Sequence, residues 1–395
     1  MRHRAPRLDG AARLIGTLGM TTVPARMLVA AAAVIAVVAT SGGLASSNHA
    51  QAVQARSAIP SDFYGVSVST ALTEEDYQRL AAANIRTLHV SMWWPDIATG
   101  PRSYRWLFDG VVLNAAKAGI TVVPSLLGSP GFVSNDPMRP PLDSEEERAL
   151  WQDFVRSAVE RYGPGGEFWE YVRACPPDPG RCMPDVPYLP ITVWQAWNEP
   201  NLGRFWQPTP SPDEYAELLR ITSDAAHGVD PEADVITGGI MPGGPGAPNA
   251  LPQNDFIAAL YQRDADQHFD GLSLNPYQRK PKQARARVQD ARAVTQAYGD
   301  AQTPIWVTEI GWSIKGPKDL AQVTNRKRQA KRLAQVMEML TAARDTLNIR
   351  LASWFTYKDP ATNLCKWCHG AGLFDKHDKA RPAWKKYVGI TGGQD

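Results

Sequence analysis

Short apolar segments rich in β-branched residues alternate with longer segments of helical periodicity from about residue 62 to the end of the chain. Between residues 144 and 161, Leu150, Phe154 and Ala158 recur at the spacing of one helix face. Another helix is expected from Thr73, whose hydroxyl can cap it ahead of consecutive acidic residues. This alternation predicts a parallel sheet with crossover helices. The expected strands are 63–68, 85–91, 120–126, 191–197, 235–239, 271–275, 305–309 and 351–356.

Eight strands that alternate with helices predict a (β/α)8 TIM barrel. No internal repeat or linker divides residues 62–395, so we expect one α/β domain there. In such a barrel the loops that follow the strands converge on one mouth. The candidate reactive residues are therefore those at and just beyond the end of each strand.

The N-terminal residues do not continue this pattern. A positively charged segment precedes an unbroken apolar run at 27–39, which is short for a membrane span and typical of a signal peptide. Residues 50–52 have the form of a cleavage site, and 43–45 are a second candidate. We expect 1–52 to be a signal peptide, 53–61 a linker, and the domain to be secreted. The alternative is an uncleaved anchor, which would be the chain's contact with a membrane and would also leave the domain extracellular.

Composition and charge narrow the possible partners. The 395 residues include 42 basic and 40 acidic ones, and this even balance gives no reason to expect nucleic acid as a partner. Tryptophan occurs 13 times, and copies near strand ends, such as Trp206 and Trp312, are candidates to bind a ligand through a flat apolar face. We expect a monomer that needs no metal and no other cofactor.

Two glutamates stand where the barrel would place its chemistry. Glu199 follows the strand 191–197, and Glu309 ends the strand 305–309, which lies nearly opposite. Cleavage of a glycosidic bond needs one carboxyl group to protonate the departing oxygen and another to attack the anomeric carbon or activate water. The pair therefore predicts a glycoside hydrolase acting on a polysaccharide or oligosaccharide.

Glu199 lies in an Asn-Glu-Pro at 198–200, and Glu309 lies in a Thr-Glu at 308–309. The sequence around these motifs resembles the clan A retaining glycoside hydrolases, in particular bacterial members near families 39 and 5. The resemblance covers about residues 62–388. It implies that Glu199 is the acid/base and Glu309 the nucleophile of a retaining β-glycosidase that acts on an extracellular or cell-envelope polysaccharide by double displacement. The segments that carry it are 161–166, 194–201 with its Asn-Glu-Pro, 306–313 with its Thr-Glu, 372–375 and 382–384.

The same resemblance assigns substrate-binding roles near the glutamates. Asn198 matches the residue that hydrogen-bonds the sugar 2-hydroxyl, Trp354 the tryptophan that floors the subsite at the cleavage point, and Tyr277 a tyrosine that supports the nucleophile.

Two positions depart from the family pattern. Asn275 stands where relatives usually have a histidine, and an amide can hydrogen-bond a sugar but cannot carry a proton. Arg86 is the candidate for an arginine near the nucleophile, although Trp93 and Trp94 lie further along than expected. His89 would point to the opposite face from Arg86 and is expected to be a packed residue.

The four cysteines of an exported chain can pair in three ways. Cys175 and Cys182 precede the fourth strand, whereas Cys365 and Cys368 follow the eighth, at the other end of the barrel. Disulfide geometry then favours two local bonds, Cys175–Cys182 and Cys365–Cys368. The alternative for Cys365 to His369 is the C-x-x-C-H pattern of haem attachment.

A basic cluster follows the sixth strand. It is either a solvated helix face or a contact for an anionic glycan, since this loop borders the mouth. Its members are Arg279, Lys280, Lys282, Arg285 and Arg287.

Two further functions use the same barrel. A transglycosylase would employ both glutamates but exclude water. A non-catalytic carbohydrate-binding barrel would need neither glutamate, and the presence of both argues against it.

Overall fold

The computed structural model describes residues 58–173, 183, 185–243, 249–360 and 365–395. Within them, parallel strands run around a barrel in the order β7-β6-β5-β2-β1-β10-β9-β8. The barrel closes where the Ile240 N–H donates to the Ser273 carbonyl (3.0 Å) and the Asn275 N–H donates to the Ile240 carbonyl (3.1 Å). The predicted (β/α)8 barrel is confirmed. The expected signal peptide lies outside the described residues, as does most of the expected linker.

All eight predicted strands are present, and their ends differ from the predicted ones by at most two residues. They are β1 (Tyr64–Val68), β2 (Thr87–Trp93), β5 (Thr121–Leu127), β6 (Val193–Ala196), β7 (Asp234–Thr237), β8 (Leu272–Leu274), β9 (Ile305–Ile310) and β10 (Ile349–Phe355). A separate two-stranded antiparallel sheet consists of β3 (Ala98–Gly100) and β4 (Ser103–Tyr104).

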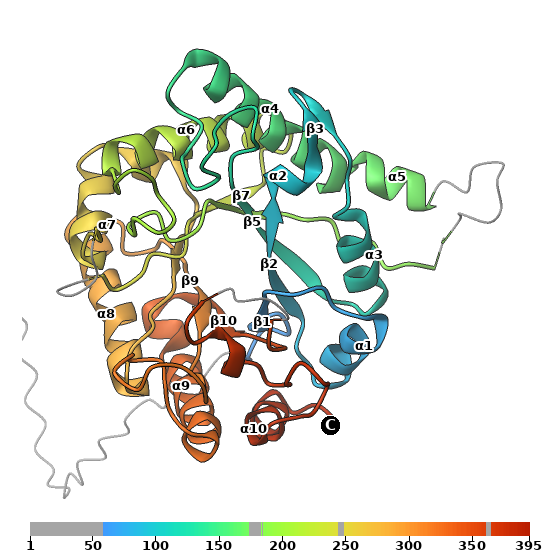
Figure 1. Ribbon diagram of the computed structural model, residues 1–395, viewed down its shortest axis with the longest axis vertical. Coiled ribbons are helices and arrows are strands. Elements are labelled where there is room, and N and C mark those ends of the chain that lie inside the picture. The colour runs from blue at the N-terminus through green and yellow to red at the C-terminus, as the bar shows by residue number, and fades with distance from the viewer. Residues whose placement is uncertain (1–57, 174–182, 184, 244–248, 361–364) are drawn as a thin grey trace, which may run out of the picture. The chain divides into compact units, whose positions relative to one another are not determined.

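Helices surround the strands (Figure 1). The expected cap of the first one is present, because the Thr73 hydroxyl accepts from the Asp76 N–H and the Asp76 carboxylate accepts from the Thr73 N–H. No helix of the described residues is long and apolar enough to cross a membrane. The helices are α1 (Glu74–Ala82), α2 (Trp94–Ile97), α3 (Asp109–Lys117), α4 (Glu145–Tyr162), α5 (Glu167–Arg173), α6 (Pro212–His227), α7 (Gln253–Tyr261), α8 (Pro281–Ala297), α9 (Arg326–Leu347) and α10 (Pro382–Thr391), with short 3-10 turns η1 (Ala265–His268) and η2 (Cys368–Gly370).

The inside of the barrel changes from apolar to polar toward the mouth. An apolar layer consists of Val123, Ile236, Trp306 and Leu351, with Val193 packed against them. Side chains alternate across a strand, so the residues two positions further on point inward one layer closer to the mouth. In β5, β6, β9 and β10 these are Ser125, Gln195, Thr308 and Ser353.

His89 belongs to this polar layer and is a packed residue, as predicted. Its Nε2 lies 3.0 Å from Gln195 Oε1, and its Nδ1 lies 3.2 Å from Ser67 Oγ. Burial lowers the pKa of His89 to about 4, although the hydrogen bond to Gln195 opposes this change. The imidazole is therefore neutral near pH 7 and serves as a hydrogen-bonding member of the barrel interior.

Candidate active site

Glu199 and Glu309 lie at the same end of the barrel. Glu199 follows β6 and is buried, whereas Glu309 is the second-last residue of β9 and is partly exposed. Burial raises the pKa of Glu309 and the negative charge of Glu199 raises it further, so the two carboxyl groups act on each other across a common space. The tertiary structure thus brings together two groups that are 110 positions apart in the chain.

One short segment after β8 donates a hydrogen bond to each carboxylate. The Asn275 Nδ2 donates to Glu199 Oε1 at 2.9 Å, and the Tyr277 hydroxyl donates to Glu309 Oε2 at 2.8 Å. Both donors are buried. Since only Pro276 separates them, a shift of this segment would disturb both carboxylates at once.

The pKa values of both carboxyl groups are raised. Burial raises the pKa of Glu199 to about 7, and burial together with the charge of Glu199 raises that of Glu309 to about 8. The hydrogen bonds from Asn275 and Tyr277 act in the opposite direction. Because each negative charge disfavours the other, the two groups titrate as a pair and hold about one proton between them near neutral pH.

The Asn275 amide is held in one orientation by the polar interior of the barrel. Thr308 Oγ1 donates to Asn275 Oδ1 at 3.0 Å, which leaves Nδ2 to face Glu199. With its proton used on Asn275, Thr308 Oγ1 accepts from Ser273 Oγ at 2.6 Å, and Ser273 Oγ lies 3.3 Å from Gln195 Oε1. A series of polar contacts therefore extends from His89, deep in the barrel, to Glu199 at its mouth.

Two glycines after β7 make room for these groups. A Cβ on Gly239 would lie 2.4 Å from Asn275 Oδ1, and one on Gly238 would lie 2.8 Å from Cδ of Pro200. Real Cβ atoms do not approach other atoms so closely. The sequence predicted Gly238 and Gly239 only as the end of a strand. Their role, which is to leave space for Asn275 and Pro200, depends on residues that the fold brings beside them.

The backbone around Glu199 adopts an uncommon conformation. Trp197 and Glu199 have positive φ angles of 67° and 45°, which non-glycine residues adopt rarely and often at functional sites. The Trp197 carbonyl is fixed by hydrogen bonds from Ser125 Oγ (3.0 Å) and Gln195 Nε2 (2.9 Å). Among the described residues, the buried Asn198 Oδ1 has no hydrogen-bond partner, so it is an acceptor that a bound donor would satisfy.

Two aromatic residues that we did not predict pack against Tyr277. The ring of Trp367 lies 5.2 Å from that of Tyr277, and the ring of Phe355 lies 6.3 Å from it. Trp367 stands between Cys365 and Cys368, whose predicted disulfide is confirmed. Both sulfurs are used in this bond, so neither is left for the thioether bonds that the haem-attachment alternative needs. The predicted pair Cys175 and Cys182 lies outside the described residues.

The ring of Trp354 does not line the site, contrary to the prediction. Inward-facing positions of β10 include Leu351, so alternation along the strand turns Phe355 inward and Trp354 outward. The Trp354 indole is fully buried, and its N–H donates to the Ala371 carbonyl at 3.2 Å. The aromatic residue of β10 that faces the inside of the barrel is Phe355, the next residue. Only the orientation of β10 in the closed barrel shows this.

Trp312 and Trp206 are also core residues rather than ligand-binding ones. Trp312 is fully buried, with its ring 6.1 Å from that of Trp354 and the guanidinium of Arg332 on α9 over its face. Trp206 is fully buried between Trp197 and Tyr215, with ring separations of 5.8 and 5.4 Å. Neither ring is left open to a ligand.

Arg86 lies at the wrong end of the barrel for the role we predicted. It precedes β2, and its guanidinium donates to the Ala118 carbonyl at 3.0 Å, whereas the mouth is formed where the strands end. No three His, Cys, Asp or Glu side chains gather as metal ligands would in the part of the chain that the structure describes.

The chain resembles solved glycoside hydrolases in fold, at low sequence identity. No protein-family model matches the sequence, and no curated protein matches it. A family 39 glycoside hydrolase from Bacteroides cellulosilyticus WH2 is 18% identical, with a TM-score of 0.63 over 84% of this chain and 63% of that one. A glucosidase from Croceicoccus marinus is 16% identical, with a TM-score of 0.60 over 84% and 67% of the two chains. A monomeric β-xylosidase from Caulobacter crescentus CB15 is 19% identical, with a TM-score of 0.57 over 83% and 68%.

At these identities the similarity shows the fold, and the predicted resemblance to clan A glycoside hydrolases is confirmed at that level. The chain spans 63% of the length of the family 39 structure.

The orientation of Asn275 can be tested through Thr308. Thr308→Val removes the hydroxyl that fixes the amide oxygen, so Glu199 loses part of its hydrogen bond and its pKa should rise, by about one unit. Carbon-13 NMR titration of the glutamate carboxyl groups measures this change. Thr121→Val, at the start of β5 and the opposite end of the barrel, is the matched control. An unchanged pKa of Glu199 in folded Thr308→Val would contradict the chain of contacts described above.

Proposed function

We propose that this chain is a retaining β-glycoside hydrolase in which Glu199 is the acid/base and Glu309 the nucleophile. The observation that carries the proposal is the pair of carboxyl groups with raised pKa values at the ends of β6 and β9, each with its own hydrogen-bond donor. Buried carboxyl groups with shifted pKa values in such a place are typical of catalytic residues. The fold shared with solved glycosidases supports the same reaction class.

The reaction has two displacements. In the first, the Glu199 carboxyl group gives its proton to the glycosidic oxygen while the Glu309 carboxylate attacks the anomeric carbon, which forms a covalent glycosyl-enzyme and releases the leaving sugar. In the second, the Glu199 carboxylate takes a proton from water, which attacks the anomeric carbon and frees Glu309. Configuration is retained because each step inverts it.

The shared proton is suited to this sequence. At neutral pH the pair holds about one proton, so one group can donate while the other attacks. In the ligand-free protein the larger rise falls on Glu309, but the role of acid belongs to the group beside the leaving oxygen. Contact with the substrate, rather than the order of the resting pKa values, therefore assigns the two roles.

The groups around the pair are suited to a sugar. The unpartnered Asn198 Oδ1 can accept a hydrogen bond from a hydroxyl, which agrees with the 2-hydroxyl contact that the resemblance implies. The rings of Phe355 and Trp367 supply apolar surface beside Tyr277, against which the C–H face of a sugar can pack. We take the substrate to be a β-linked polysaccharide outside the cell or in its envelope.

Export is part of this proposal. The charged segment followed by the apolar run at 27–39 supports cleavage near Ala52 and release of the folded domain. Mass spectrometry of the secreted protein should find residues 1–52 missing. Secreted protein that retains the apolar run would instead indicate an anchor.

The two glutamates should give opposite products when each is replaced. Glu309→Ala removes the attacking group and should abolish turnover, and azide entering the vacated space should yield a glycosyl azide of inverted configuration. Glu199→Ala should still react with aryl glycosides whose leaving group needs no protonation. Azide should then release its covalent intermediate with retained configuration.

Proton NMR of the two azide products distinguishes the anomers. A structural role for these carboxylates would not produce opposite anomers. The assignment fails if the wild type inverts configuration, or if both variants cleave the natural glycan.

Tyr277 should set the acidic limb of the pH profile. Its hydroxyl lowers the pKa of Glu309, so Tyr277→Phe should raise that pKa. Because the nucleophile must be ionised, the rise of kcat/KM with pH should move to higher pH, whatever the change in maximal rate. The control is Tyr298→Phe, which removes the hydroxyl of an exposed tyrosine. A limb that stays in place or moves to lower pH would exclude this role.

A further inference from the structure

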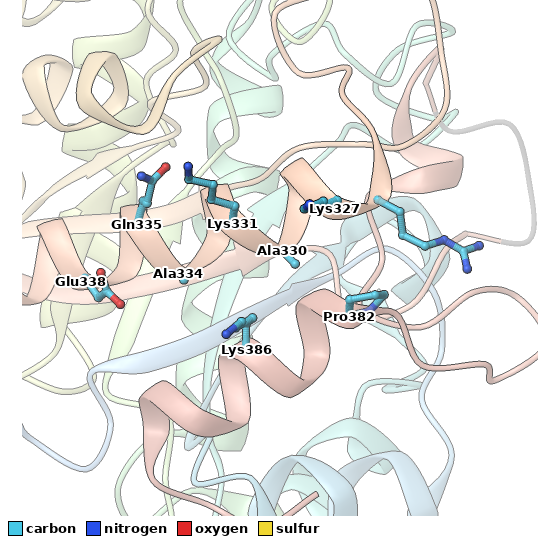
Figure 2. Close-up of a pocket in the computed structure, with 9 residues that line it drawn as sticks. Lys327, Ala330, Lys331, Ala334, Gln335, Glu338, Pro382 and Lys386 are labelled. Carbon is cyan, nitrogen blue, oxygen red and sulfur yellow. The ribbon is translucent and has the colours of Figure 1, made fainter.

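Two grooves lie side by side on the outside of the barrel, one on each side of α9. The first, of about 700 Å³, runs between α9 and α10 (Figure 2). The second, of about 380 Å³, lies between α9 and the start of α8. Lys331 and Gln335 line both grooves and so form the ridge between them. Neither groove includes Glu199 or Glu309, so this surface is separate from the carboxylate pair.

Basic side chains form a large part of the lining of both grooves. They are four of the nine residues that line the first groove and five of the eight that line the second, with Lys331 common to both. Among the residues that the structure describes, Glu338 is the one carboxylate that lines either groove. We call these side chains the basic surface. They are Lys280, Lys282, Arg326, Lys327, Arg328, Lys331, Arg332 and Lys386.

The basic surface lacks the counter-charges found elsewhere on the barrel. Within the described ranges, none of its eight side chains forms an ion pair with a carboxylate. On α6, by contrast, Arg220 pairs with Glu217 at 2.9 Å and with Asp224 at 2.7 Å. Side chains on this part of the surface are therefore available to an anionic partner.

The arrangement is electrostatically unfavourable in the absence of a partner. The first turns of α8 and α9 contain no acidic residue, and α9 begins with Arg326, Lys327 and Arg328, whose charges oppose the helix dipole. Burial, followed by repulsion from Arg328 and Arg279, lowers the pKa of Arg332. Its Nη1 has no hydrogen-bond partner among the described residues. A bound anion would relieve the repulsion.

We propose that the basic surface binds a linear polysaccharide that carries carboxylate groups. The choice of a polysaccharide rests on the proposed function, whereas the need for an anion rests on the surface itself. Helices begin at the mouth end of the barrel, and Lys280 lies three residues after Tyr277, so their Cα atoms are within about 11 Å of each other. A chain held there is close to the carboxylate pair.

The lining residues favour a glycan over other polyanions. No aromatic side chain of the described residues lines either groove, so this part of the surface lacks the stacking platforms of single-strand nucleic-acid sites. The apolar residues Ala330, Ala334 and Pro382 line a concave groove rather than project from the surface, unlike those of a helix that inserts into a membrane. The arginine forks can bind a carboxylate through two hydrogen bonds, as they can a phosphate, so they agree with the proposed ligand and the comparison of probes below distinguishes the two.

Binding can be measured without turnover, using the intact chain and polygalacturonate as the probe, at low and at high NaCl. The wild type should bind, and the affinity should fall with salt as counterions compete. Lys327→Glu/Lys331→Glu should raise Kd about tenfold or more at low salt and flatten the salt dependence. The milder Lys327→Gln/Lys331→Gln should give an intermediate change, which guards against a folding defect in the first variant.

Arg105→Glu/Lys117→Glu is the matched control, since it makes the same change in net charge at exposed positions near and on α3 (Figure 1). It should leave Kd within about twofold of the wild type. The proposal is overturned if polygalacturonate does not bind, if the control weakens binding as much, or if duplex DNA or phosphatidylserine vesicles bind more tightly than polygalacturonate. Glu309→Ala should bind as the wild type does, so a failure of the proposed hydrolysis would leave this test intact.

Discussion

Two carboxyl groups, of a buried Glu199 and a partly exposed Glu309, share one space at the mouth of this barrel, and the surrounding structure serves to make that arrangement stable. A buried carboxylate is costly unless hydrogen bonds compensate it, and two together favour a state with a single proton. The compensation comes from one segment, in which Asn275 donates to Glu199 and Tyr277 donates to Glu309. Placing both donors on one segment after β8 couples the geometry of the two groups, as the proposed two-step reaction would require.

The polar layer inside the barrel contacts the segment that carries Asn275 and Tyr277 and orients the Asn275 amide. An amide can turn either end toward a carboxylate, and only the N–H end stabilises the charge. Thr308 fixes the choice, and polar contacts through Ser273, Gln195 and His89 continue into the barrel. The neutral state of His89 suits a network in which no buried charge except those of the two glutamates has to be compensated. Gly239 completes the arrangement by leaving space for Asn275.

The outer helices divide between two electrostatic patterns. On α1, α4 and α6 the first turns are acidic, which agrees with the helix dipole and stabilises the fold locally. On α8 and α9 the first turns lack acidic residues, and basic side chains line the grooves beside them. The first turn of α10 likewise has no acidic residue, so the departure from the stabilising pattern covers the helices that follow β8, β9 and β10.

The sequence by itself determined the barrel, its eight strands and the two strand ends that carry Glu199 and Glu309. The reason is that hydrophobic periodicity, and the alternation of strand and helix segments along the chain, can be read from the sequence directly. It also located Tyr277 and Asn275, through motif resemblance.

The sequence did not determine which aromatic side chain faces the site. Trp354 and Phe355 are neighbours, and a strand turns them to opposite faces, so only the register in the closed barrel decides that Phe355 points inward. Trp206 and Trp312 are similarly enclosed by residues distant in sequence, and Arg86 precedes its strand by a single residue, which places it at the opposite end. The burial that raises the pKa values of the two glutamates, and the hydrogen bonds that oppose it, come from segments distant in sequence, and for that reason tertiary structure alone could reveal them.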